Sequence, residues 1–192
     1  MKVYNRRADE YIYGYLDYIE TNPEEFNEDH RLLPSFIRKE LKKPNVYIDY
    51  DGLDEIYEFY DKYLPFEFMP WQWFVICFVF GVYEDYENEI MLFNRFFIYM
   101  GRGGGKNGFI TALVLGLLSN VHGVRNYDID IIANSEKQAK TSFEELYDWI
   151  DYDKRLTPAF YKTKSEITFR ATNSTLGFRT SNPKTADGGR QG

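Results

Sequence analysis

One stretch constrains the fold of this chain more than any other: FIYMGRGGGKNGFITALVLGLL, from Phe97 to Leu118. Within it, the short run GRGGGK places four glycines, an arginine and a lysine between two apolar segments. Each glycine loses more backbone entropy on ordering than a residue with a side chain, so neither a strand nor a helix favours so many in its interior. The glycines therefore predict a loop between two buried elements.

The segments around this loop predict alternating strands and helices. FNRFFIYM, residues 93–100, is a nearly continuous aromatic and apolar run, which is typical of a strand buried on both faces of a parallel sheet. Residues 108–120, after the loop, are apolar nearly all round and predict a helix covered on both sides. Residues 127–133 predict a second strand, followed by a helix capped by Ser135 or Asn134. This order implies right-handed crossovers and a parallel sheet.

The rest of the second half, EITFRATNSTLGFRTSN, predicts a strand pair that turns at 172–174. We therefore expect the α/β fold class, with a P-loop NTPase-type parallel sheet flanked by helices and a helical region before it. We place an acidic helical region at 1–64 and the sheet domain at 65–192.

The charged residues divide the chain into the same two parts, an acidic first part and a basic second part. Residues 1–92 carry 9 Lys and Arg against 20 Asp and Glu, whereas residues 93–192 carry 14 against 10. Apolar residues at helical spacing in the acidic part predict helices at about 5–20, 24–42 and 52–63, and another after Pro70. NPEEF predicts one helix start, with Asn22 as the cap and Pro23 at the first helical position.

Composition excludes several classes of protein. A hydrophobic fraction of 44% over 192 residues is enough for a packed core, so the chain is not disordered. The longest apolar run, Trp73–Val82, is too short to cross a bilayer, and we expect a soluble intracellular protein. The single cysteine, Cys77, excludes an internal disulfide, and His30 and His122 are too isolated to suggest a zinc site.

The glycine loop has the features of a phosphate site. A loop that opens a helix presents backbone N–H groups at the positive end of the helix dipole, and this geometry binds phosphate. Gly103, Gly104 and Gly105 would let the backbone approach phosphate oxygens, and Lys106 would reach the outer phosphates. We therefore expect the loop to cradle a nucleotide triphosphate; the alternative is a glycine-rich turn with an incidental lysine.

The loop departs from the common P-loop pattern at two positions. That pattern is G-x-x-x-x-G-K-[ST], and Gly105 and Lys106 match its Gly-Lys pair. Met100 stands where the leading glycine would be, and Asn107 replaces the serine or threonine that coordinates magnesium. The carboxamide oxygen of asparagine is nevertheless a hard ligand that magnesium accepts.

The motif Arg102–Asn107 resembles the arginine-led Walker A variant of tailed-phage terminase large subunits, the ATPase motors that pump double-stranded DNA into capsids. Three further segments are similar in order and spacing. Pro70–Gln72 resembles the family's adenine-recognising glutamine segment, and Ile131–Leu146 resembles the strand and helix after the P-loop helix. Phe178–Gly192 resembles the stretch before the Walker B strand. The resemblance covers roughly residues 60–192.

The resemblance implies ATP and Mg²⁺ as cofactors and gives each site residue a role. Lys106 would hold the β and γ phosphates, and Arg102 would contact the γ phosphate as charge develops, or else anchor the loop to a neighbouring acid. Asn107 would be the metal ligand, and Gln72 would recognise adenine unless it is only a polar residue at a helix start. The expected nucleotide-binding residues are Gln72, Arg102, Gly103, Gly104, Gly105, Lys106, Asn107 and Gly108.

Thr111 lies one turn after Asn107 and could assist the metal only if the helix began later than predicted. Basic residues of the second half could track DNA phosphates, although scattered cations usually form a solvated face. These residues are Lys137, Lys140, Lys162, Lys164, Arg170 and Arg179.

For the whole protein, the resemblance implies a DNA-packaging motor in the host cytoplasm. It would bind double-stranded DNA, the portal protein and a small terminase subunit, and form a homo-oligomeric ring without membrane contact. The acidic Walker B strand of the family has no counterpart, so we expect an N-terminal fragment that is inactive by itself. Two alternatives remain open: another P-loop ATPase of helicase-like type, and a truncated fragment that binds nucleotide without turnover.

Overall fold

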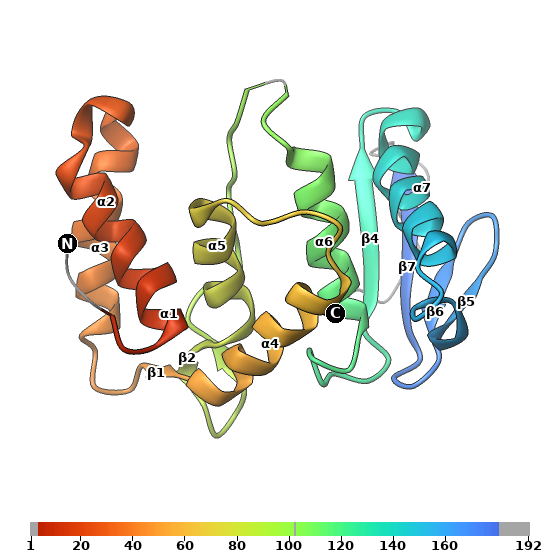
Figure 1. The fold of residues 1–192 in the computed structure, drawn as a ribbon, viewed down its shortest axis with the longest axis horizontal. Coiled ribbons are helices and arrows are strands. Elements are labelled where there is room, and N and C mark those ends of the chain that lie inside the picture. The colour runs from red at the N-terminus through yellow and green to blue at the C-terminus, as the bar shows by residue number, and fades with distance from the viewer. Residues whose placement is uncertain (1–3, 102, 181–192) are drawn as a thin grey trace. The chain divides into compact units, whose positions relative to one another are not determined.

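The computed structural model of the chain describes residues 4–101 and 103–180, which form two compact units (Figure 1). The first unit comprises the residues up to Asp61 together with Pro65–Ile98. The second comprises Lys62–Leu64 and the residues from Tyr99 onward. Residues 65–98, which the sequence analysis assigned to the sheet domain, thus cluster with the N-terminal helices.

The first unit begins with one continuous helical stretch, as the pattern at 5–20 predicts. It consists of α1 (Arg7–Asp9), the π-helical turn η1 (Glu10–Gly14) and α2 (Tyr15–Thr21). A short 3₁₀ turn, η2 (Pro23–Glu25), leads to α3 (Glu28–Leu41).

The predicted start of the second helix at Asn22 is wrong. Helix α3 begins after Asn27, whose side-chain oxygen accepts a hydrogen bond of 2.8 Å from the N–H of His30. The side chain of Asn22 instead donates to the carbonyl of Tyr18, at 2.9 Å, and so closes the preceding helix. Pro23 opens only the 3₁₀ turn, which has no side-chain cap; the side-chain oxygen that accepts from a backbone N–H at the start of α3 belongs to Asn27.

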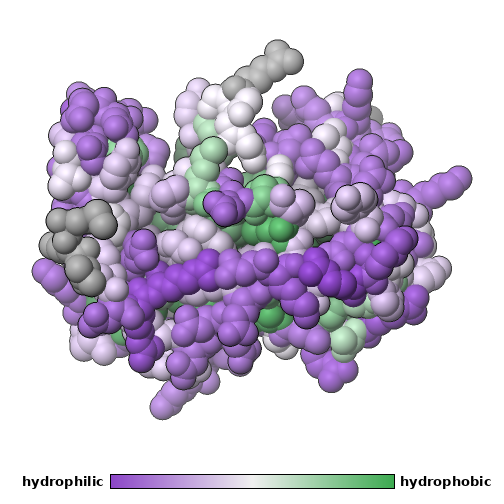
Figure 2. Space-filling model, viewed as in Figure 1, coloured by the Kyte–Doolittle hydropathy of each residue, from purple (hydrophilic) through white to green (hydrophobic). Residues whose placement is uncertain are grey.

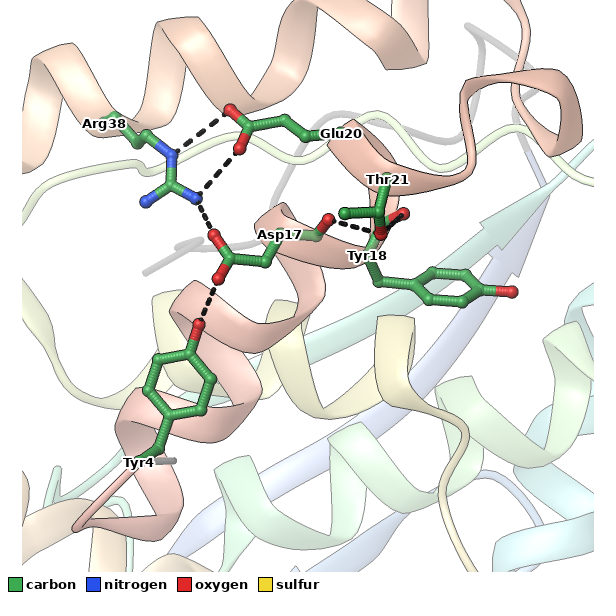
Figure 3. Close-up of polar contacts among 6 residues, drawn as sticks. All are labelled: Tyr4, Asp17, Tyr18, Glu20, Thr21 and Arg38. Carbon is green, nitrogen blue, oxygen red and sulfur yellow. Dashed lines mark hydrogen bonds and ion pairs between the residues drawn. The ribbon is translucent and has the colours of Figure 1, made fainter. Parts of the chain in front are cut away.

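A polar cluster joins α2 to α3 (Figure 3). The guanidinium of Arg38 contacts the carboxylates of Asp17 and Glu20, with Nη2 at 3.3 Å from Oε2 of Glu20. Asp17 also accepts a hydrogen bond of 2.6 Å from the hydroxyl of Tyr4. Burial, together with this bond to Asp17, raises the pKa of Tyr4 to about 12. The cluster therefore holds the two helices and the start of the chain together through charge-assisted hydrogen bonds.

Helices α4 (Tyr50–Tyr63) and α5 (Pro70–Phe80) confirm the remaining helix predictions of the first half. An aromatic core holds them against η1: the rings of Tyr11 and Trp73 stack with centroids 4.9 Å apart, and Tyr57 meets Trp73 edge-on at 5.3 Å. The thiol of Cys77 is buried in this core: the residue is 0% exposed and its Sγ lies 3.0 Å from the hydroxyl of Tyr57.

The first unit also contains a small antiparallel sheet that the sequence analysis did not predict. Its order is β1 (Tyr47–Ile48), β2 (Val82–Asp85) and β3 (Ile90–Met91). Strands of two to four residues are too short to show a period-two pattern over a window of several residues, so periodicity could not reveal them.

The predicted strand at 93–100 is wrong. No residue of this segment is in a strand, and most of its side chains are exposed, with Phe97 at 93% and Tyr99 at 85%. A strand requires a neighbouring strand for its N–H and C=O groups, and none of the described strands pairs with this segment. Apolar composition alone therefore misidentified an exposed extended segment as a buried strand.

The second unit contains α6 (Lys106–Leu118), β4 (Asp128–Ala133) and α7 (Glu136–Tyr152), all at predicted positions. The cap at Ser135 is confirmed, since its hydroxyl accepts from the N–H of Gln138 at 3.3 Å. After the 3₁₀ turn η3 (Thr157–Ala159) come β5 (Phe160–Lys162), β6 (Ile167–Phe169) and β7 (Ser174–Thr180). The last two confirm the predicted strand pair, whereas β5 was not predicted.

The sheet of this unit has the order β4-β7-β6-β5, and the expectation of an all-parallel sheet needs correction. Among the described strands, only β4 and β7 run parallel, from Asp128 opposite Thr175 to Ala133 opposite Thr180. Strands β5, β6 and β7 are joined by short turns, and such turns can connect only antiparallel neighbours. The fold is α/β with a mixed sheet.

Helices α6 and α7 pack against each other and against β7. The ring of Phe143 on α7 lies 4.9 Å from that of Phe178 on β7, and Leu115 of α6 is 0% exposed. Residues alternate between the faces of a strand, so Asp128 and Asp130 lie on the opposite face of β4 from Ile129 and Ile131. Figure 2 shows a largely hydrophilic surface with smaller apolar areas.

Candidate functional site

The glycine loop has the backbone conformation that the sequence predicts. Gly103 and Gly105 have φ angles of +86° and +77°, in the left-handed region that favours glycine. A Cβ added to either residue would meet no atom within 4 Å, so glycine is required there for conformation and not for space. Gly105 is the residue directly before α6 and sets the direction in which the chain enters the helix.

The backbone amides at the start of α6 are available to a ligand. The N–H of Phe109 bonds to the carbonyl of Gly105 at 3.1 Å, as in a regular first turn. The three amides before it, on Lys106, Asn107 and Gly108, have no hydrogen bond within the described part of the chain. These are the amides that a helix leaves without an internal partner, and they lie at the positive end of its dipole.

The loop itself is only lightly bonded. The N–H of Gly104 donates to the carbonyl of Gly101 over a long 3.3 Å. The loop residues from Gly103 to Gly105 are exposed, so their amide groups are not buried in the fold. An anion can therefore reach this turn without displacing a packed side chain.

The charged and polar side chains of the loop are also accessible. Lys106 and Asn107 are exposed, and neither has an ion pair or side-chain hydrogen bond among the described residues. Lys106 is the first residue of α6, so its exposed side chain begins at the same helix end as the three open amides. Arg102, the second predicted cation, lies outside the described residues.

The site lies at the end of the sheet where ligands bind in α/β proteins. Figure 1 shows β4 pointing toward the end of the second unit from which α6 descends. Because β7 is parallel to β4, the carboxyl ends of both strands and the first turns of α6 and α7 lie at this one end. Ligands in open α/β sheets bind beyond the carboxyl ends of parallel strands.

Thr111 does not face the loop. Helix α6 begins at Lys106, and Thr111 is 2% exposed and donates from Oγ1 to Oε2 of Glu145 on α7 at 3.0 Å. Its hydroxyl therefore contributes to helix packing, in agreement with the expectation that it would assist a metal only if the helix began later.

Gln72 begins a helix in the first unit. Its side-chain oxygen accepts a hydrogen bond of 2.7 Å from the N–H of Met69, and the residue is 4% exposed. This bond satisfies one of the backbone amides at the start of α5. Gln72 therefore has the role of a polar residue at a helix start, which was the alternative to adenine recognition. Recognition of adenine by Gln72 stays a prediction.

Most of the predicted DNA-tracking cations have partners within the second unit. Lys162 contacts Asp151 at 2.5 Å and donates to the carbonyl of Tyr147 at 2.9 Å. Lys140 pairs with Glu144, Arg179 pairs with Asp130, and Arg170 donates to the carbonyl of Phe160. Only Lys137 and Lys164 lack such side-chain contacts in the described part of the chain, and DNA contact by any of these residues stays a prediction.

Two features bear on metals and membranes. Among the described residues, no group of three or more His, Cys, Asp or Glu side chains could hold a metal ion. No described helix combines the length and the apolar character needed to span a bilayer.

Comparison with known proteins gives a structural likeness. The fold is similar to the crystal structure of the HK97 bacteriophage large terminase, with a TM-score of 0.56 and 22% sequence identity. The match covers 66% of this chain and 26% of that protein, so the chain corresponds to about a quarter of its length. No family model matches the sequence, and no curated protein sequence matches it. At this identity the likeness shows a terminase-like fold.

Proposed function

We propose that the chain is the ATP-binding N-terminal part of a viral DNA-packaging motor. The observation that carries the proposal is the set of three open amides on Lys106, Asn107 and Gly108, next to an accessible ammonium group and a lightly bonded glycine turn. The terminase-like fold supports the same assignment. The whole protein would couple ATP hydrolysis to movement of double-stranded DNA into capsids.

In this proposal the loop residues bind the phosphates and the chemistry depends on charge neutralisation. The amides accommodate phosphate oxygens, and Lys106 neutralises the β and γ phosphates as a point charge. Arg102 contacts the γ phosphate, for which a planar guanidinium is well shaped. Asn107 offers a carboxamide oxygen to Mg²⁺, which neutralises charge on the phosphates when bound. Gln72 contacts the adenine edge with its amide group.

The partners of the whole protein are inferred from the resemblance of the sequence motifs to terminase large subunits. We include double-stranded DNA, a portal protein, a small terminase subunit and a homo-oligomeric ring in the host cytoplasm as parts of the proposal. They require binding measurements with the respective partners.

The proposal is tested by replacing Lys106. Loss of a hydrogen-bonded charge costs about 1.5–3 kcal/mol, so K106A should weaken binding of a fluorescent ATP analogue by about 10- to 150-fold. K154A removes an exposed lysine of the same unit that lies just beyond the C-terminal end of α7, and it should leave affinity unchanged. Equal affinities of wild type and K106A would refute the assignment.

A second candidate, which the sequence leaves open, is nucleotide binding without turnover. ATP hydrolysis measured with and without double-stranded DNA distinguishes the two. Phosphate release above background, abolished by K106A, supports an active ATPase; ATP binding without phosphate release supports the second candidate.

A further inference from the structure

The tip of the small sheet in the first unit is an exposed surface that is both aromatic and acidic. Strands β2 and β3 and the turn between them, VYEDYENEIM at 82–91, carry four acids and no basic residue. Their surface encloses an open hollow of about 500 Å³ lined by Asn45, Glu84, Asp85, Tyr86, Glu87 and Ile90. The phosphate loop belongs to the other unit, so this surface and the candidate nucleotide site share no residues.

Apolar groups are exposed around this hollow. The ring of Tyr86 is packed against that of Tyr47, with centroids 4.3 Å apart, and lies edge-on to Tyr83 at 5.1 Å. Tyr47 and Tyr86 are each 46% exposed, and Ile90 is 51% exposed. Tyr86 and Ile90 lie on the hairpin and Tyr47 lies on the adjoining strand β1, so these exposed side chains offer contact area that a partner could cover.

The tip has a fixed shape. The carboxylate of Asp85 accepts from both the backbone N–H and the side-chain amide of Asn88, at 3.2 and 2.7 Å. Asn45 donates from Nδ2 to the carbonyl of Glu84 at 3.0 Å and so ties the preceding segment to the hairpin. A partner would therefore meet a preorganised surface, which lowers the entropy cost of binding.

The charge at the tip is largely negative, although the ammonium group of Lys43, which pairs with Glu40, also interacts electrostatically with Glu84. Glu84, Glu87 and Glu89 form no ion pair within the described part of the chain. The nearby carboxylate of Asp49 raises the pKa of Tyr86 above its ordinary value, as expected where negative charge surrounds the ring. A partner that contacts both the tyrosine rings and the carboxylates should be positively charged, because a cation interacts favourably with the face of a tyrosine ring and with a carboxylate.

We propose that the β2–β3 hairpin is a docking surface for a basic polypeptide segment, with an arginine side chain placed on Tyr86 between the carboxylates of Glu84 and Glu87. Arginine fits better than lysine, because its planar guanidinium stacks on a ring while donating to carboxylates. The apolar side chain of Ile90 would contact the aliphatic part of the segment.

The test uses the full chain and a fluorescein-labelled peptide of alternating arginine and glycine, followed by fluorescence anisotropy at low and high salt. E84Q/E87Q should weaken binding by about five- to tenfold, the combined effect expected of two partly exposed ion pairs. Y86L, which leaves every charge in place, should weaken it by about two- to fivefold. The matched variant E55Q/E58Q removes two exposed acids of α4 in the same unit and should change affinity by less than about twofold.

Three outcomes would overturn the proposal. Equal losses in E84Q/E87Q and E55Q/E58Q would show only a general attraction to an acidic chain. Full competition by spermine together with wild-type affinity in Y86L would show a site for small polyamines without aromatic recognition. Self-association of the wild-type chain that is abolished by E84Q/E87Q, without peptide binding, would show that a second copy covers the surface. A failure of ATP binding leaves this test unaffected, because the hairpin lies in the other unit.

Discussion

Replacing Gly105 by alanine tests whether the left-handed turn before α6 is the phosphate-binding conformation. The φ of +77° costs an L-amino acid about 1–2 kcal/mol, and no neighbouring atom lies within 4 Å of the new Cβ to add a steric cost. The loop has few bonds and can relax in the free protein, so the nucleotide must restore the strained turn. At 1.4 kcal/mol per tenfold, G105A should bind ATP about 5- to 30-fold more weakly.

The control is Gly123, which precedes β4 in the α6–β4 connection. It also has a positive φ, +73°, and open space around its Cβ, so G123A introduces the same kind of strain at a different position. Its ATP affinity should match that of wild type, while urea unfolding shows that both variants are folded. G105N should fall between wild type and G105A, because asparagine tolerates the left-handed region better than alanine.

The measurement is the dissociation constant of a fluorescent ATP analogue, with magnesium present, for wild type and the three variants. Wild-type affinity in G105A would refute the idea that this turn holds the phosphates. Equal losses in G105A and G123A would show that the effect comes from general destabilisation of the second unit.

Three further predictions concern the first unit. R38A should lower the free energy of unfolding by about 1–2 kcal/mol, because two carboxylates lose a charge-assisted donor, whereas K39A on the same helix should have little effect in the same urea titration. Iodoacetamide should not alkylate Cys77 in the folded chain at about pH 8, because burial raises the pKa of its thiol to about 12; rapid labelling detected by mass spectrometry in the absence of urea would contradict this. The hydrogen bond from Arg7 lowers the pKa of Asp61, so their ion pair should stabilise the fold above the ordinary carboxyl range and be lost as pH falls through the lowered value. D61N should therefore flatten the pH dependence of stability between about pH 5 and pH 3, and an unchanged dependence would exclude the pair as its source.

Helices of the second unit could be predicted because each carries a long, consistent signal. In α7, Ala139, Phe143, Leu146 and Ile150 recur at helical spacing and all are buried, and Ser135 supplies the cap. In α6, an apolar run directly follows the glycines, and the structure buries most of it. Local composition and tertiary packing agree in these elements, so sequence reasoning succeeds.

The secondary-structure predictions failed where contacts with residues distant in the sequence determine the local structure. Residues 93–100 have the composition of a buried strand, but strand formation depends on a neighbour that the sequence pattern cannot show. Asn22 and Asn27 both precede acidic residues, and only tertiary context selects Asn27 as the cap of α3. The hairpin at 82–91 was overlooked because its strands are too short to show a period-two pattern.

The glycine loop could be located from the sequence because glycine at a positive φ has a backbone cause that neighbouring residues seldom override. The role of Gln72 could not, since a glutamine at the third position of a helix fits both ligand recognition and capping. The contacts of the six basic residues could not be predicted either, because a salt bridge such as that of Lys162 with Asp151 joins residues from different elements.

Strand β4 has consequences for handling the protein in solution. It is the last strand on its side of the described sheet, so one row of its N–H and C=O groups faces no other described strand, and Ile132 is 54% exposed on it. Such an edge is a template for extra strands from other molecules. Concentrated preparations should consequently tend to precipitate through this edge, and a lysine substituted for Ile132 offers a direct way to keep the purified chain monodisperse.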